Sequence, residues 1–239
     1  MEEISSQEAE QYSGPVNWIT HHEVYKPGSL STPVRLVSNS SFCNGKTNLN
    51  DLTIKGPNTL ADLFSNLLMF RGYEVGLIYD ITKAYNSMKT GLVEKHIRRL
   101  WMRMNPDIED WKLYGFTCVQ FGDRPAATLM TIAVEKASEN YEEVAANLNL
   151  DKEVVIEDAK KLLLNTYVDD GMTGGRIKDV KRMLGDKLPD GSFSGTISKM
   201  MQSVGLKLKT IVSTLDPDPQ AAEKLSSKVL GYLFDVNKD

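Results

Sequence analysis

The stretch Leu162-Leu163-Leu164-Asn165-Thr166-Tyr167-Val168-Asp169-Asp170-Gly171 joins an apolar run to two adjacent carboxylates and a glycine. An apolar run bounded by turn residues is typical of a buried strand, and Asp-Asp-Gly is typical of a hairpin turn. We therefore expect a strand up to Val168, after a helix over Ile156–Leu162. Two acids at the tip of a hydrophobic strand lose hydration, which a metal ion, a cation partner or a water-facing turn would offset. The stretch alone predicts either an ordinary exposed turn or a cation site.

A second stretch has the same form. Val75-Gly76-Leu77-Ile78-Tyr79-Asp80 is an apolar strand pattern that ends in one aspartate, and Tyr85 follows five residues later. Three aspartates at two strand ends can share divalent ions, as metal-dependent phosphoryl transfer requires. The pairing of the two stretches favours the cation site over the ordinary turn.

The bulk composition fits an ordinary globular protein. The 239 residues are 41% hydrophobic and 25% charged, with a net charge of -4, which argues mildly against a nucleic-acid binder unless basic groups cluster on one face. Cys43 and Cys118 are too few for a disulfide framework and predict free thiols in a reducing compartment. The acidic start is not a secretory signal, and no run is apolar enough to span a bilayer, so we expect a cytoplasmic protein.

The remaining pattern predicts alternating strands and helices. Residues 1–15 are polar and acidic and predict a mobile arm, while Trp18–Val24 and Pro33–Val37 predict a hairpin. The segment Thr90–Arg103 predicts a helix that carries the densest basic run of the chain. That run consists of Lys95, His96, Arg98, Arg99 and Arg103. It is either a solvated face or a phosphate-contacting patch.

The ordered motifs resemble those of reverse transcriptases. Four of them occur in the family's order: Asp80-x-x-x-x-Tyr85, Gln120-Phe121-Gly122-Asp123-Arg124-Pro125, Tyr167-Val168-Asp169-Asp170 and Leu230-Gly231-Tyr232. The finer resemblance is to retrotransposons of the BEL/Pao class. It is carried by His21-His22-Glu23-Val24-Tyr25-Lys26-Pro27, Arg35-Leu36-Val37, Leu49-Asn50-Asp51, Lys55-Gly56-Pro57 and Leu67-Leu68-Met69-Phe70-Arg71. The resemblance covers about residues 17 to 236.

The resemblance implies a two-metal active site for nucleotidyl transfer. Asp80, Asp169 and Asp170 match the catalytic carboxylates that hold two Mg²⁺ ions, for which Mn²⁺ can substitute, and the carbonyl of Ile81 matches a further ligand. Tyr85 matches the steric gate that excludes a ribose 2′-hydroxyl, although a core aromatic would also fit its position.

The same resemblance implies nucleotide and primer contacts. Lys26 and Arg35 match fingers cations that contact the triphosphate, against the plainer interpretation of exposed hairpin cations. Gln120, Phe121 and Gly122 match the segment that packs on the nascent base pair. Lys209 is a candidate general acid toward pyrophosphate, with Lys207 as an equally near alternative. The primer-binding residues implied are Tyr167, Leu230, Gly231 and Tyr232.

The implied fold is α+β: a right-hand polymerase palm with an antiparallel sheet backed by helices, plus a fingers subdomain. We expect residues 16–75 and 86–120 to be mainly fingers, and 76–85 and 121–239 mainly palm. The latter would end at a primer-supporting hairpin, with neither thumb nor RNase H domain following.

The implied function is that of an RNA-directed DNA polymerase fragment acting on dNTPs and a primed RNA or DNA template. Its parent would be a longer polyprotein, in an intracellular particle of a retroelement, without membrane partners. One alternative is an inactive element remnant that acts as a nucleic-acid or protein-binding module. An RNA-directed RNA polymerase would share the acids, but a bulky residue at Tyr85 would hinder ribonucleotides.

Overall fold

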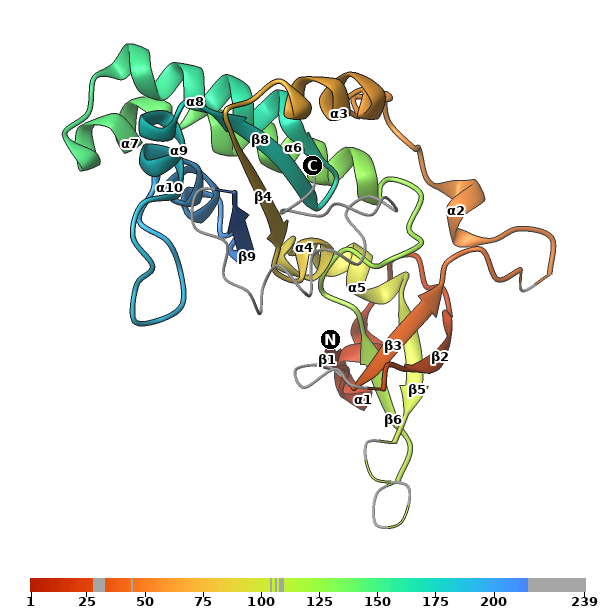
Figure 1. The fold of residues 1–239 in the computed structure, drawn as a ribbon. Helices are drawn as coiled ribbons and strands as arrows, with labels where there is room; N and C mark the ends of the chain where they lie inside the picture. The colour runs from red at the N-terminus through yellow and green to blue at the C-terminus, as the bar shows by residue number, and fades with distance from the viewer. Residues whose placement is uncertain (28–32, 44, 104, 106, 108–109, 215–239) are drawn as a thin grey trace. The chain divides into compact units, whose positions relative to one another are not determined.

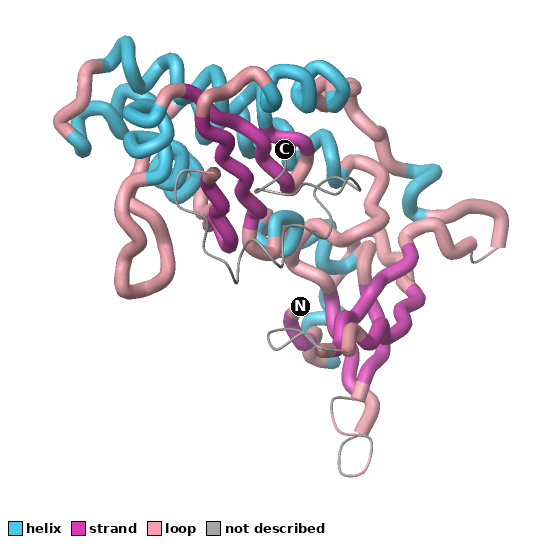
Figure 2. Tube along the Cα trace, viewed as in Figure 1, coloured by secondary structure: helices cyan, strands magenta, loops and turns pink. Residues whose placement is uncertain are grey.

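The computed structural model describes residues 1–27, 33–43, 45–103, 105, 107 and 110–214. Over these residues the chain is α+β with small antiparallel sheets, as predicted (Figure 2). Two compact units are formed: unit 1 comprises Met1–Pro57 and Tyr85–Ala126, and unit 2 comprises Asn58–Ala84 and the described residues after Ala126. Residues 58–75, which we expected mainly in a fingers subdomain, lie in unit 2, and their helix packs on its sheet.

Unit 2 is built around one antiparallel sheet with the strand order β7-β8-β4-β9. Helices α3, α8 and α9 pack against β8 (Figure 1). Its elements are, in chain order, α3 (Leu63–Arg71), β4 (Val75–Ile81), α6 (Ala126–Glu139), α7 (Tyr141–Leu148), α8 (Lys152–Asn165), β7 (Thr166–Tyr167), β8 (Asp170–Gly175), α9 (Ile177–Leu184), α10 (Thr196–Ser203) and β9 (Leu208–Ser213).

The two central strands have different neighbours on their two faces. Phe70 of α3 packs on Ile78 and Met172, which are cross-strand partners and share one face of the sheet. On the opposite face, Asn165 at the end of α8 donates a hydrogen bond from Nδ2 to Thr173 Oγ1 at 3.1 Å. Side chains alternate between the two faces along each strand. The even-numbered residues of β4 and β8 therefore lie on the face of Ile78 and Met172, and the odd-numbered residues lie on the opposite face.

Helix α8 overturns the predicted strand over Leu162–Val168. The helix runs to Asn165 and strand β7 holds only Thr166 and Tyr167. Asp151 caps the helix by accepting a hydrogen bond from Glu153 N at 2.9 Å. The buried residues Val155, Ala159 and Leu162 have helical spacing, whereas a buried strand would also bury Leu164, which is 60% exposed.

Unit 1 contains two small sheets, β1-β6-β5 and β2-β3. The predicted hairpin is confirmed, with β2 and β3 antiparallel and Tyr25 opposite Val34. Its elements are β1 (Glu2–Glu3), α1 (Ser6–Gln11), β2 (Thr20–Tyr25), β3 (Val34–Asn39), α2 (Leu49–Leu52), α4 (Ala84–Ser87, at the boundary), α5 (Leu92–His96), β5 (Arg99–Met102) and β6 (Lys112–Gly115). A core of Ile19, Leu49, Leu100 and Phe116 holds them together.

The predicted mobile arm over residues 1–15 is wrong for its first twelve residues. Strand β1 pairs with β6, and Ile4 is 3% exposed with its N–H donating to Leu113 O at 2.8 Å. Helix α1 begins after Ser5, whose hydroxyl accepts a hydrogen bond from Glu8 N. Burial of Ile4 and the backbone pairing order this segment despite its polar composition.

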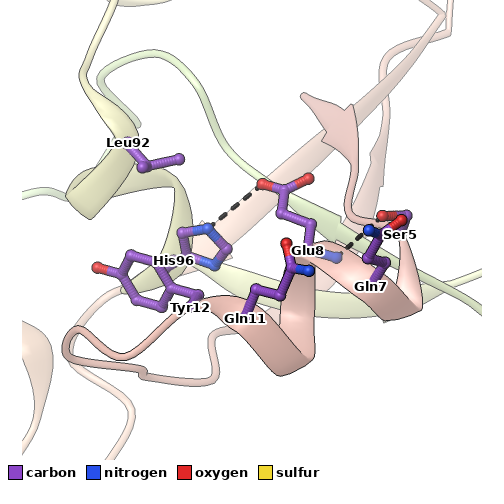
Figure 3. A pocket seen from close by; sticks show the side chains of 7 residues that line it. All are labelled: Ser5, Gln7, Glu8, Gln11, Tyr12, Leu92 and His96. Carbon is purple, nitrogen blue, oxygen red and sulfur yellow. Dashed lines mark hydrogen bonds and ion pairs between the residues drawn. The ribbon is translucent and has the colours of Figure 1, made fainter.

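The predicted basic helix over Thr90–Arg103 is also wrong. Its first part is α5, and its second part is strand β5. Lys95, His96, Arg98 and Arg99 are buried rather than gathered on a solvated or phosphate-contacting face. Lys95 Nζ lies 2.9 Å from Glu8 Oε1. The His96 ring stacks on Tyr12, and its Nε2 lies 3.3 Å from the same carboxylate (Figure 3). Lys95 and His96 therefore contact the N-terminal helix, whereas Arg98 pairs with Asp123.

Two general features agree with the sequence. Cys43 and Cys118 are free thiols, the former exposed and the latter buried. Among the helices of the described residues, none combines the length and the apolar composition that crossing a membrane requires.

Candidate active site

Asp80 and Asp170 form a cross-strand pair in the central sheet of unit 2. They are direct partners in the antiparallel pairing of β4 and β8, which places their Cα atoms about 4.5–5.5 Å apart and their side chains on one face. Tyr167 continues the row as the partner of Asp170 on β7. Ile78 and Met172 on the same face are buried under α3, while Asp80 and Asp170 are only half-buried. The acids thus lie where the covered part of this face ends.

Asp169 reaches the same place through the turn between β7 and β8. Tyr167 pairs with Asp170, so the hairpin loop consists of Val168 and Asp169. The carbonyl of Asp169 accepts a hydrogen bond from Ile81 N at 2.9 Å, which ties the turn to the end of β4. The backbone positions of the three aspartates, which are at most 90 residues apart in sequence, therefore lie close together in the fold.

The turn holds a strained backbone. Val168 has a φ of 60°, in the left-handed region that disfavours a β-branched residue. A two-residue hairpin loop with a positive φ at its first position ordinarily takes glycine there. Such a conformation costs about 1–3 kcal/mol and persists only when its surroundings impose it, most often at functional sites.

Electrostatics favour a cation beside Asp169. Burial raises the pKa of the Asp169 carboxyl above its ordinary value, because removal from water disfavours the charged form. A nearby cation would offset this cost and keep the group ionised at neutral pH.

The pairing of β9 with β4 places the backbone of Lys207 and Lys209 beside the end of β4 that carries Asp80. Asp80 pairs with Thr210 and Ile81 pairs with Leu208, so Lys209 is the extra residue of a β-bulge opposite this step. The carbonyl of Lys207 accepts a hydrogen bond from Thr82 N at 2.7 Å. The exposed side chain of Lys207 lines a surface hollow together with Lys199 and Asp190.

The donor set fits hard divalent cations. Carboxylate and backbone carbonyl oxygens are the ligands that Mg²⁺ and Mn²⁺ prefer, and Asp80, Asp169 and Asp170 supply the carboxylates. Within the residues that the structure describes, no cluster of three or more His, Cys, Asp and Glu side chains has the arrangement of a preformed metal cage.

A second set of predicted residues lies on unit 1. Arg35 of β3 is the cross-strand partner of Val24. Lys26 comes two residues after Val24, and its N–H donates a hydrogen bond to Pro33 O at 2.8 Å. By strand alternation Lys26 and Arg35 therefore share one face of the hairpin, and both side chains are exposed. They form a pair of cations at the end of β2-β3 where the chain connects the two strands.

Tyr85 lies with the turn before α6. Its ring meets Phe121 edge-on, with centroids 4.8 Å apart, and Phe121 is 51% exposed. Gln120 is buried and donates from Nε2 to Cys118 O at 3.0 Å, so its side chain supports the turn from within. Gly122 has a φ of 89°, which a residue with a side chain would adopt only under strain.

Sequence reasoning missed the residues that hold this turn. The carboxylate of Asp123 accepts hydrogen bonds from Arg98 Nε at 3.1 Å and Gln120 N at 3.1 Å, and also from Ser40 Oγ. Asn50, within the Leu-Asn-Asp motif, donates from Nδ2 to Gly122 O at 2.9 Å and accepts from Arg124 N at 2.8 Å. Two motifs 72 residues apart are therefore one structural element. The sequence signal for Asp123 is its place between Gly122 and Pro125, because glycine and proline favour a tight turn.

The predicted residues thus fall into two sets, one on each unit, and Leu230, Gly231 and Tyr232 lie outside the described residues. Comparisons of the chain with protein-family models and with curated proteins find no match.

Proposed function

We propose that this chain is the fingers-palm region of an RNA-directed DNA polymerase, of the kind found in BEL/Pao retrotransposons, with unit 2 as its palm. The reaction would be transfer of a deoxynucleotide to a primer 3′-hydroxyl with release of pyrophosphate. The observation that carries the proposal is the row of Asp80 and Asp170 beside the strained turn that holds Asp169. An ordinary exposed turn would require neither the second acid strand nor the strained valine.

Asp80, Asp169 and Asp170, with the carbonyl of Ile81, would hold two Mg²⁺ ions. When bound, such ions lower the pKa of the attacking hydroxyl and neutralise the triphosphate and the leaving group. The raised pKa of Asp169 supports this role, because the ions would relieve an electrostatic cost that the folded chain otherwise carries.

The other residues would select and orient the nucleotide. The exposed pair Lys26 and Arg35 would contact the triphosphate, as cations on one hairpin face can. Tyr85 would exclude the ribose 2′-hydroxyl by the bulk of its ring. Phe121, exposed and edge-on to Tyr85, would pack on the nascent base pair with Gln120 and Gly122. Lys209, at the bulge, would protonate pyrophosphate, and Tyr167 would contact the primer end.

Primer extension tests the proposal. The chain is incubated with a primed RNA template, Mg²⁺ and either deoxynucleotides or ribonucleotides, and Asp169→Asn is the matched control that changes one charge. We expect extension with deoxynucleotides by the wild type and none by the variant. Extension that persists in Asp169→Asn would exclude the two-metal site. A chain that shows no Mn²⁺ binding and no extension would instead favour a non-catalytic binding module.

A further inference from the structure

A second row of residues crosses the same strands directly beside the acid row. Tyr79 on β4 is the partner of Gly171 on β8, and Gly171 is the partner of Thr166 on β7. These residues are adjacent in sequence to Asp80, Asp170 and Tyr167, so alternation places them on the opposite face of the sheet. The acids and this second row therefore lie back to back.

Tyr79 spans the second row from one side to the other. Its side chain is 1% exposed, and its Oη lies 2.7 Å from Thr166 Oγ1. Thr166 Oγ1 donates its hydrogen to Leu162 O at 2.6 Å, so Tyr79 must be the donor in the shared bond. The chain of hydrogen bonds connects β4 to the last turn of α8, where β7 begins.

Gly171 leaves the space through which the tyrosine reaches. A Cβ at this position would overlap the Tyr79 ring. An aromatic ring that covers a cross-strand glycine is a known means of fixing strand register. Here it fixes the register of the two strands that present Asp80 and Asp170.

This arrangement supplies the support that the strained turn needs. Val168 and Asp169 follow Thr166 by two and three residues, and the hairpin is short because β7 has only two residues. We propose that Tyr79 and Thr166 are positioning residues, which hold the acid-bearing turn in its strained conformation from the buried side of the sheet. The relevance to catalysis rests on the proposed function, whereas the mechanical role does not.

The hydroxyl and the ring of Tyr79 make separate contacts, the hydroxyl with Thr166 Oγ1 and the ring over Gly171. Replacement by phenylalanine removes only the donor and keeps the ring over Gly171.

Three variants test the role. Tyr79→Phe removes the donor, Thr166→Val removes the acceptor, and Thr166→Ser keeps the hydroxyl. A matched control is Thr131→Val, which removes a threonine bond to a helix carbonyl elsewhere in unit 2, from Thr131 Oγ1 to Ala127 O at 3.2 Å.

The first readout is amide hydrogen exchange of Ile81, whose N–H is bonded to the carbonyl of Asp169. We expect exchange about tenfold faster in Tyr79→Phe and Thr166→Val, which corresponds to about 1.4 kcal/mol. Thr166→Ser and Thr131→Val should exchange as the wild type does. Unchanged exchange in both Tyr79→Phe and Thr166→Val would overturn the proposal, whether or not the chain has activity.

The second readout separates positioning from general stability. Mn²⁺ affinity and kcat should fall about tenfold in Tyr79→Phe, while the KM for primer-template stays unchanged. Wild-type Mn²⁺ affinity and kcat in Tyr79→Phe, alongside a loss of both in Asp169→Asn, would overturn the positioning role and leave the proposed function standing. Equal Mn²⁺ binding by the wild type and Asp169→Asn, without primer extension by either, would refute the proposed function. In that case the hydrogen exchange of Ile81 would still decide whether Tyr79 and Thr166 support the turn.

Discussion

The buried ion pair between Arg98 and Asp123 provides a quantitative test of how unit 1 is held together. Both side chains are at most 5% exposed, and Arg98 Nε lies 3.1 Å from Asp123 Oδ2. The same carboxylate accepts hydrogen bonds from Gln120 N and Ser40 Oγ, so three donors depend on it. The perturbation is Asp123→Ala, which removes the acceptor and leaves the guanidinium buried.

The expected cost is large because a buried charge is left without its partner. Removing one member of a buried ion pair typically costs about 3–5 kcal/mol, and the two further donors lose their acceptor as well. A whole domain is stable by only about 5–15 kcal/mol, so unit 1 should be close to unfolding in this variant. Replacing both partners, as Arg98→Met with Asp123→Leu, should recover most of the loss, because neither charge of the pair then remains buried.

Tryptophan fluorescence during urea unfolding measures this loss in the correct unit. The chain has three tryptophans, Trp18, Trp101 and Trp111, and all belong to unit 1. Lys136→Met is the control, since it breaks an exposed pair with Glu139 in unit 2 and should leave the transition unchanged. A loss in Asp123→Ala below about 1 kcal/mol, the scale of one ordinary hydrogen bond, would refute the reasoning.

Three further predictions concern titration, strain and selectivity. Burial and the nearby charge of Arg99 lower the pKa of His96 in the folded protein. The neutral ring of His96 therefore contributes its full stability above the ordinary pKa of about 6.5, and this contribution falls as the pH drops below that value. Tryptophan-monitored unfolding should show this loss between pH 7 and 5, and His96→Gln should remove it; an unchanged slope in the variant contradicts the assignment. Val168→Gly should raise stability by about 1 kcal/mol in thermal unfolding followed by circular dichroism, and a lower melting point would show that the turn is not strained. Tyr85→Ala should reduce the preference for deoxynucleotides at least tenfold in kcat/KM, and an unchanged preference would exclude a steric gate.

The fold class and the positions of several elements could be predicted from sequence, because they rest on local periodicity. The β2-β3 hairpin, for example, was predicted from two short strand patterns at Trp18–Val24 and Pro33–Val37. Two errors have a common cause. In both Leu162–Val168 and Thr90–Arg103 the chain changes from helix to strand within one run of similar residues. Composition does not mark such a change when no glycine or proline separates the two elements.

The basic run shows why charge pattern alone does not identify a partner. Lys95 and Arg98 have acidic partners, Glu8 and Asp123, which lie 87 and 25 residues away in sequence. No local pattern connects a cation to a carboxylate at such a distance, so the run resembled a surface patch. The burial of Lys95 and His96 could be anticipated only once the N-terminal segment was known to fold onto α5.

The glycine after the two aspartates has a different reason in the structure from the one that its sequence suggests. Asp-Asp-Gly is typical of a turn, where glycine supplies a positive φ. Here the turn residues are Val168 and Asp169, and Gly171 lies within β8, opposite Tyr79. Its requirement is therefore space for the Tyr79 ring rather than backbone freedom. It follows that Gly171→Ala should be severely destabilising with Tyr79 present and tolerated better with Tyr79→Ala. A conformational requirement would make the two substitutions additive.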